Sequence, residues 1–253
     1  MLEIKITDEA EKALDDGRIR YFGFSFHDNL ETFKSIVDYY DGWTFCQIQY
    51  NYMDTDYQAG TEGLRYAANK GLAVVVMEPI RGGQLAAGPP ERIAGLWDTS
   101  PVKRSPAEWA LRWVWNQPEV AVVLSGMSNM AQVEENLAGA DRSGVGTMSD
   151  FETALVAKVA ETYREIGPVP CTGCRYCMPC PNGVDIPQVF GIYNDIALYG
   201  DDKRPKRLYV LRLAENERAD SCIECGECLE KCPQEIDIPR WLKEADKVLA
   251  PVT

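Results

Sequence analysis

Two cysteine-rich runs, 171–181 and 222–233, carry the residues best suited to chemistry in this chain of 253 residues. Each run opens with three cysteines at C-x2-C-x2-C spacing and closes on a further cysteine followed by proline. Eight of the nine cysteines lie in these runs. Such a triplet wraps a short loop so that three thiolates reach three corners of a cubane, while the cysteine before proline ligates elsewhere. The spacing predicts two 4Fe-4S clusters.

The ligands are expected to be exchanged between the two runs. Each cluster would bind one triplet together with the last cysteine of the other run. The predicted ligands are Cys171, Cys174, Cys177 and Cys232 for one cluster, and Cys222, Cys225, Cys228 and Cys180 for the other. The segments 180–187 and 232–239 also repeat each other at an offset of 52 residues, which indicates an internal two-fold. The two runs are not identical in spacing, because the first ends in C-x2-C and the second in C-x3-C.

Structural zinc and disulfide bonds are two other common uses of clustered cysteines. Four-cysteine zinc sites usually consist of two separated C-x2-C pairs rather than tight triplets with a trailing Cys-Pro. A disulfide framework is typical of secreted proteins, and residues 1–8 have neither the basic nor the apolar region of a signal peptide. The pattern therefore favours iron-sulfur clusters. The ninth cysteine, Cys46, lies in an apolar run and is expected to be a buried core thiol.

The overall charge and hydropathy limit the classes of partner. The net charge of −13 would repel a phosphate backbone, so we expect no nucleic-acid partner. No apolar run approaches the roughly 20 residues that span a bilayer, so we expect no membrane partner and a cytoplasmic location. A reducing compartment also suits thiolate ligands. An acidic docking surface for a basic redox partner is an alternative meaning of the charge.

Alternating strands and helices precede the cysteine runs. Apolar runs predict strands over 19–24, 45–50, 72–77 and 120–124. Capping residues, such as Asp28 with Glu31 at the start of the second helix, and stop signals predict helices over 8–17, 28–40, 62–70, 129–138 and 149–166. Ser105, Pro106 and Glu108 give a further helix its N-cap, first-turn proline and capping-box glutamate. Parallel strands require such helical crossovers, so the four units are βα units. Segments 188–199 and 205–218 also have helical patterns, which predicts an α-helical ferredoxin part.

Four segments resemble the aldo-keto reductases, namely 18–25, 47–51, 77–83 and 126–136. Together with the cysteine runs, they look most like the branch of that family fused to a C-terminal two-cluster ferredoxin domain. The resemblance implies a barrel of eight βα units with a nicotinamide cofactor at the carboxyl ends of its strands. The four units here match the family's strands five to eight. No residue here matches the family's catalytic Asp, Tyr, Lys and His, so catalytic residues stay unassigned.

The expected fold class is therefore α/β, with three parts. Residues 1–148 would form the C-terminal half of a TIM (β/α)8 barrel, and residues 149–170 a linker helix. Residues 171–253 would form the α-helical ferredoxin-like domain with two 4Fe-4S clusters.

The resemblance also implies a set of cofactor contacts at the strand ends and in the loops that follow. The implied residues are Ser25 and Gln47 or Gln49 at two strand ends, Arg81, Gly82 and Gly83 at the pyrophosphate, Gly126 and Ser128 at the phosphate position, and Gln132, Glu135 and Asn136 toward the adenosine. Met77 stands where the family usually has an aromatic ring, and residues 126–129 contain no Lys or Arg to bind a 2′-phosphate. NAD, NADP and a flavin therefore all stay open.

Electron counting suggests how the two parts would cooperate. Hydride carriers exchange two electrons and cubanes exchange one, so we expect an iron-sulfur oxidoreductase that passes electrons between a nicotinamide-type site and the clusters. A half barrel leaves two unpaired strand edges. We therefore expect a fragment, or one part of a barrel completed by another chain or by a second copy. The other expected partner is a redox protein or electron carrier. The alternative is a non-catalytic electron-transfer or docking subunit.

Overall fold

The computed structural model describes residues 6–171, 173, 175–199, 203–232 and 234–250. The chain divides into two compact units. The first holds the described residues up to Pro89 together with Trp97–Lys158, and the second holds Pro90–Leu96 and the described residues from Val159 onward. Helix α7 (Asp150–Ile166) begins in the first unit and ends in the second.

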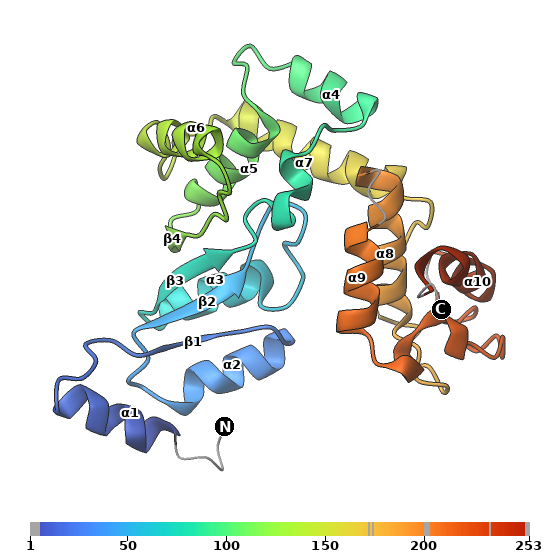
Figure 1. The fold of residues 1–253 in the computed structure, drawn as a ribbon, viewed down its shortest axis with the longest axis horizontal. Helices are drawn as coiled ribbons and strands as arrows, with labels where there is room; N and C mark the ends of the chain where they lie inside the picture. Colours follow the sequence, from blue (N-terminus) through green and yellow to red (C-terminus); the bar gives the residue numbers. More distant parts are fainter. Residues whose placement is uncertain (1–5, 172, 174, 200–202, 233, 251–253) are drawn as a thin grey trace. The chain divides into compact units, whose positions relative to one another are not determined.

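A four-stranded parallel sheet forms the centre of the first unit (Figure 1). Its strands are β1 (Gly23–Ser25), β2 (Phe45–Gln49), β3 (Ala73–Met77) and β4 (Val120–Val123), in spatial order β1-β2-β3-β4. Gly23 pairs with Phe45 and Phe45 with Ala73, and a register irregularity lies at Val74 and Val75 where β3 meets β4. The carboxyl ends of all four strands therefore lie at the same edge of the sheet.

Helices connect the strands of the first unit (Figure 1). The helical elements of this unit are α1 (Ile6–Asp15), α2 (Leu30–Tyr39), α3 (Gly60–Asn69), the 3-10 segment η2 (Arg81–Ala86), α5 (Pro106–Trp115) and α6 (Met130–Asp141). Helix α4 (Glu91–Asp98) follows η2 along the chain, and most of its residues belong to the second unit. The core lies between one sheet face and the helices, where Cys46 and Ile48 of β2 pack with Phe33 of α2 and Leu64 of α3. Cys46 is fully buried, as predicted.

The opposite sheet face is much less buried. Side chains alternate across a strand, and those of Gln47, Val75 and Met77 are only half-buried on this face. Ser25 and Val122 are exposed. A closed barrel would place this face in its interior.

Local sequence signals explain where several helices begin. Ser105 caps α5 by accepting a hydrogen bond from the Glu108 N–H at 3.0 Å, which confirms the predicted cap. The start of α2 differs from the prediction, because Asn29 rather than Asp28 accepts the capping bond, from the Thr32 N–H at 2.9 Å. Asp28 accepts instead from the side chain of Asn29 at 3.0 Å.

The second unit is helical and carries the cysteine runs. Its elements are α8 (Ile186–Tyr199), α9 (Lys203–Arg212), the 3-10 turns η3 (Glu215–Glu217) and η4 (Ala219–Ser221), and α10 (Ile238–Leu249). Its core gathers Phe190 of α8, Tyr209 of α9 and Leu242 of α10 around the cysteine loops. No helix among the described residues is long and apolar enough to cross a membrane.

The remaining differences from the predicted elements are small. β1 is shorter than predicted and begins four residues later, and α9 ends before the predicted segment does. Helices α4 and α10 were not predicted.

Candidate metal centres and cofactor site

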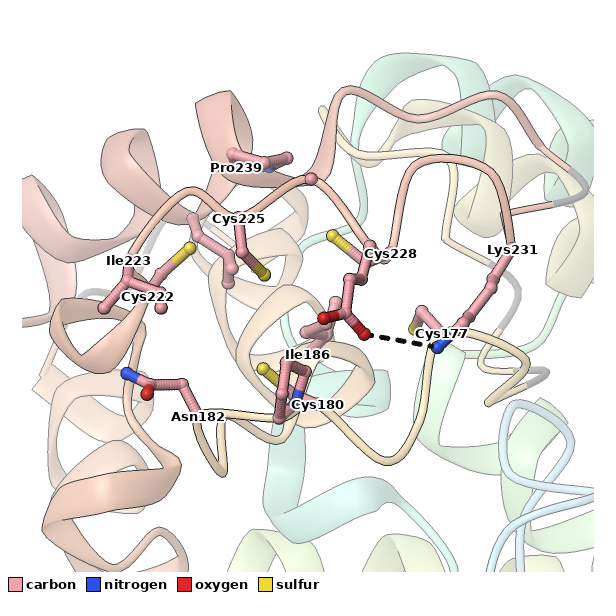
Figure 2. A pocket seen from close by; sticks show the side chains of 14 residues that line it. Cys177, Cys180, Asn182, Ile186, Cys222, Ile223, Cys225, Cys228, Lys231 and Pro239 are labelled. Carbon is pink, nitrogen blue, oxygen red and sulfur yellow. Dashed lines mark ion pairs between the residues drawn. The ribbon is translucent and has the colours of Figure 1, made fainter.

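The first of two hollows among the cysteine loops contains thiols from both runs (Figure 2). It is lined by Cys177, Cys180, Cys222, Cys225 and Cys228, with apolar side chains such as Ile186 and Leu242. The cysteine before Pro181 in the first run thus lies with the whole triplet of the second run.

The second hollow has the reciprocal composition. It is lined by Cys171 and Cys177 of the first run and by Cys232 of the second. Cys174, the remaining predicted ligand of this site, lies outside the described residues. Cys177 thus lines both hollows, and each of the other cysteines named at the hollows lines one of them. Which thiol binds which cluster stays a prediction.

Described residues of the two runs form matching backbone turns. The Met178 N–H donates to the Arg175 carbonyl at 2.9 Å, and 51 residues later the Leu229 N–H donates to the Gly226 carbonyl at 3.0 Å. Arg175 and Gly226 both have positive φ, at 63° and 80°. A second matched pair is Gly183 and Glu235, at 89° and 52°.

The matched turns lead into matched helices. The Gly183 N–H donates to the Cys180 carbonyl at 3.0 Å, and the Glu235 N–H donates to the Cys232 carbonyl at 3.1 Å. Asp185 then caps α8 through the Gln188 N–H, as Asp237 caps α10 through the Arg240 N–H, each at 3.3 Å. The internal two-fold inferred from sequence thus holds at the level of individual hydrogen bonds.

Side-chain charges lie close to both hollows. Arg175 lines the second hollow and pairs with Asp185 at 3.3 Å. Lys231 lines the first and pairs with Glu227 at 3.9 Å, drawn as a dashed line in Figure 2. Burial raises the pKa of the Cys228 thiol, and the neighbouring cysteines raise it further. A bound iron would favour the thiolate, so loading the site would release protons.

The donor set of the hollows fits an iron-sulfur cluster. Each hollow offers cysteine thiols in an apolar setting, which is the ligand chemistry of a 4Fe-4S cluster. Among the described residues, no three His, Cys, Asp or Glu side chains converge as ligands of a single ion. A cubane binds one cysteine at each iron, so its ligands need not converge on one point.

Two of the implied cofactor residues meet where Ser25 at the carboxyl end of β1 lies beside Gln47 in the middle of β2. The Gln47 Nε2 lies 3.4 Å from the Ser25 Oγ and 3.3 Å from the Met77 Sδ. Ser25 pairs with Gln47 in the sheet register, which places both side chains on the less buried face. This arrangement offers an amide and a hydroxyl to a polar ring substituent, with a polarizable thioether beside them.

Gln49 has a different role from Gln47. It is buried, and its Nε2 donates to the Asp54 Oδ2 at 3.1 Å. The same Oδ2 accepts from the Asn51 Nδ2 at 2.9 Å and pairs with the Arg81 Nε at 3.3 Å. Sequence reasoning did not single out Asn51 and Asp54 as site residues, although polar residues directly after a buried strand were an available signal.

The turn after β3 has a special backbone. Glu78 and Arg81 have φ of 55° and 51°, and Gly82 and Gly83 have φ of 61° and 96°. Left-handed conformations are costly for residues with a Cβ, so the turn needs support from its surroundings. Asn51 supplies part of it, because its Nδ2 also donates to the Glu78 carbonyl at 3.1 Å.

The implied phosphate and adenosine residues lie at the start of α6. Ser128 is exposed, and its N–H donates to the Gln132 Oε1 at 2.8 Å. The Asn136 Nδ2 donates to the Ser125 Oγ at 3.0 Å, and Glu135 accepts from the Ser105 hydroxyl. Gly126 is exposed before the helix. The side chains of Gln132 and Asn136 thus already hold groups of the preceding loop.

Comparison with known families agrees with both parts of the molecule. Residues 4–92 and 99–143 match the model of the Aldo/keto reductase family, and residues 170–236 match the 4Fe-4S dicluster domain. The chain belongs to the aldo/keto reductase family, with a C-terminal iron-sulfur domain. This confirms the predicted family, the α/β fold of a partial barrel and the ferredoxin-like second part.

Several solved structures are similar to part of the chain. They include aldo-keto reductase AKR11C1 from Bacillus halodurans in its holo form (TM-score 0.49, 22% identity, covering 59% of this chain and 53% of that chain). They also include an aldo-keto reductase from Klebsiella pneumoniae in complex with NADPH (TM-score 0.46, 21% identity, covering 59% of this chain and 51% of that chain). The chain thus spans about half the length of these relatives. A comparison with curated proteins gave no match.

Proposed function

We propose that this chain is part of an iron-sulfur oxidoreductase that passes electrons between a nicotinamide-type site and two 4Fe-4S clusters. Family membership and the iron-sulfur domain support the general class. The observation that carries the proposal further is the sorting of the described cysteines into two hollows, each lined by thiols of both runs.

The residues of this chain would divide the work between the two units. Ser25 and Gln47 would orient the cofactor carboxamide, and Gly82 and Gly83 of the turn at Arg81, which lack a Cβ, would let the backbone approach the pyrophosphate closely. A bound nicotinamide would supply two electrons as a hydride, and each 4Fe-4S cluster would carry one electron. The cysteines of the two hollows would ligate the clusters, and the apolar lining would exclude water.

The active enzyme would need a second half barrel. The sheet of this chain has four parallel strands, whereas the barrel of this fold has eight. The other strands would come from a longer form of this chain, from another chain or from a second copy. The catalytic residues would then lie on that half, and an electron carrier would be the outside partner.

An anaerobic titration of the purified chain tests the proposal. Iron and sulfide would be counted first, with about eight irons expected for two cubanes. NADH, NADPH and then dithionite would be added while the cluster absorbance is followed. Where copies of this chain complete one another's barrel, bleaching by a nicotinamide is the expected result, and it should be lost in Gln47→Ala but retained in Gln117→Ala. Gln117 is a matched control because its side chain donates to the Trp113 carbonyl at the end of α5.

The alternative function is a non-catalytic electron-transfer or docking subunit. The observation that favours it is the open sheet face, where Val122 remains 47% exposed. Such a face could bind a partner without binding a cofactor. Bleaching by dithionite alone, with about eight irons present, would support this alternative. A chain without iron would contradict both functions.

A further inference from the structure

One aliphatic side chain borders both cysteine hollows. Ile186 lines the first hollow with Cys180 and Cys228, and it lines the second hollow with Cys171. Its side chain is 1% exposed. Cys177 lines both hollows too, but it is itself a predicted ligand. The Ile186 side chain therefore forms part of the lining of both predicted cluster sites.

The internal repeat supplies a counterpart that lacks this property. Ile238 follows Ile186 by 52 residues, begins α10 as Ile186 begins α8, and is also 1% exposed. The N–H of each isoleucine donates to the carbonyl two residues earlier, at 3.1 Å for Ile186 and 2.8 Å for Ile238. Ile238 lines only the second hollow. The two isoleucines are thus matched in burial and backbone hydrogen bonding, but only Ile186 lines both hollows.

The lining of an iron-sulfur site controls the potential of the cluster bound there. Solvent exposure and hydrogen bonds to sulfur are among the factors that set this potential. The apolar shell acts by controlling solvent access and the local dielectric. Water favours the more negatively charged reduced state, so removing apolar shielding raises the potential. A side chain at two sites must act on two potentials.

We propose that the Ile186 side chain shields both cluster sites from water. One side chain would then influence the reduction potentials of both clusters. This inference rests on the proposed function, since it requires clusters in both hollows. Neighbouring residues hold Ile186 in place, because Asp185 caps the helix just before it and Phe190 and Leu242 belong to the same buried core. No other part of the chain needs to move for one substitution to affect both sites.

Redox titration of the full chain tests the inference. Ile186→Ala is expected to raise both cluster potentials, whereas Ile238→Ala is expected to raise one and leave the other at its wild-type value. Potentials would be followed by cluster absorbance and by the electron paramagnetic resonance signals of the reduced state. Ile186→Val and Ile238→Val repeat the comparison with a smaller cavity, in case either alanine variant loses its iron.

The possible outcomes distinguish a failure of this inference from a failure of the proposed function. Wild-type protein with about eight irons, but with a single potential shifted in Ile186→Ala or both shifted in Ile238→Ala, would overturn the inference alone. Unchanged potentials in every variant would do the same. Wild-type protein without clusters would instead remove the proposed function, and the inference with it.

Discussion

Asp54 receives the Arg81 guanidinium at 3.3 Å and so joins the loop after β2 to the turn after β3. The same carboxylate oxygen accepts from the Gln49 and Asn51 amides. Asn51 is fully buried and also holds the Glu78 carbonyl. The turn at residues 78–83, four of which have positive φ, is therefore supported by a polar network beside the sheet, where the family resemblance implies a pyrophosphate.

Replacing Asp54 tests how much this network stabilises the first unit. Asp54→Asn keeps the shape of the side chain but brings an amide N–H₂ among existing donors. We expect the free energy of unfolding to fall by about 1–3 kcal/mol, because buried donors lose their acceptor. Urea unfolding followed by tryptophan fluorescence would measure the loss. Asp98→Asn is the control, since Asp98 pairs with Lys103 on the surface at 3.5 Å. Equal effects of the two substitutions would argue against a stabilising network.

Paired cysteine substitutions test the exchange of ligands between the two runs. Cys180→Ala and Cys225→Ala are each expected to remove about four irons, and the double variant no more than either alone. Cys180→Ala combined with Cys232→Ala should remove about eight. Iron and sulfide assays on anaerobically reconstituted protein would give these counts. Cys46→Ala should retain the full count. Loss of both clusters in the Cys180 and Cys225 double variant would contradict the assigned grouping.

Cys46 should give stability an alkaline pH dependence. Burial raises the pKa of its thiol from 9.0 to about 12. The unfolded chain therefore releases this proton first as pH rises, and the free energy of unfolding falls between pH 9 and about pH 12. The slope is at most about 1.4 kcal/mol per pH unit. Its contribution is fully present below pH 9.

Comparison with Cys46→Ala isolates this effect from other titrating groups. The wild-type protein should be the more stable below pH 9 because the variant has a cavity, and the difference should narrow as pH rises. Urea unfolding from about pH 8 to about pH 11 covers the first part of the window. If the difference in the free energy of unfolding between the two proteins stayed constant across this range, burial would not be raising the pKa of the Cys46 thiol.

The two matched helix caps should differ in strength. Each capping aspartate is expected to contribute about 1 kcal/mol through its backbone hydrogen bond. Asp185 also pairs with Arg175, so Asp185→Ala should cost more than Asp237→Ala. Urea unfolding followed by far-ultraviolet circular dichroism would compare the two, and Arg175→Gln would measure the ion pair separately. A larger loss in Asp237→Ala would be the opposite of this expectation.

Local signals predicted most of the first unit. The Ser105 cap and the apolar run of β3 depend on neighbouring residues, so the sequence displays them directly. β1 was placed too early because its pairing with β2, which sets the strand, begins only at Gly23. Asn29 rather than Asp28 caps α2, because the side-chain Oδ1 of Asn29 accepts the hydrogen bond from the Thr32 N–H. The short helix α4 depends on the burial of Ile93 and Trp97, which local propensity does not reveal.

The candidate sites divide in the same way. Cysteine spacing indicated two groups of thiols, because a short loop allows few ways of converging on one cluster. Helix α10 could have been predicted by extending the repeat from Asp185 and Ile186 to Asp237 and Ile238. The separate roles of Gln47 and Gln49 could not have been predicted, because Gln49 is held by Asp54, which a turn brings back beside the strand.

Each hollow takes thiols from both runs, and this has a consequence for protein synthesis. Cys180 leaves the ribosome 52 residues ahead of Cys232, a delay of about 3–10 s at ordinary elongation rates. During that interval the first run has no partner, so neither hollow exists on the nascent chain. Iron loading must therefore follow translation of nearly the whole domain, and the early thiols must stay reduced until then.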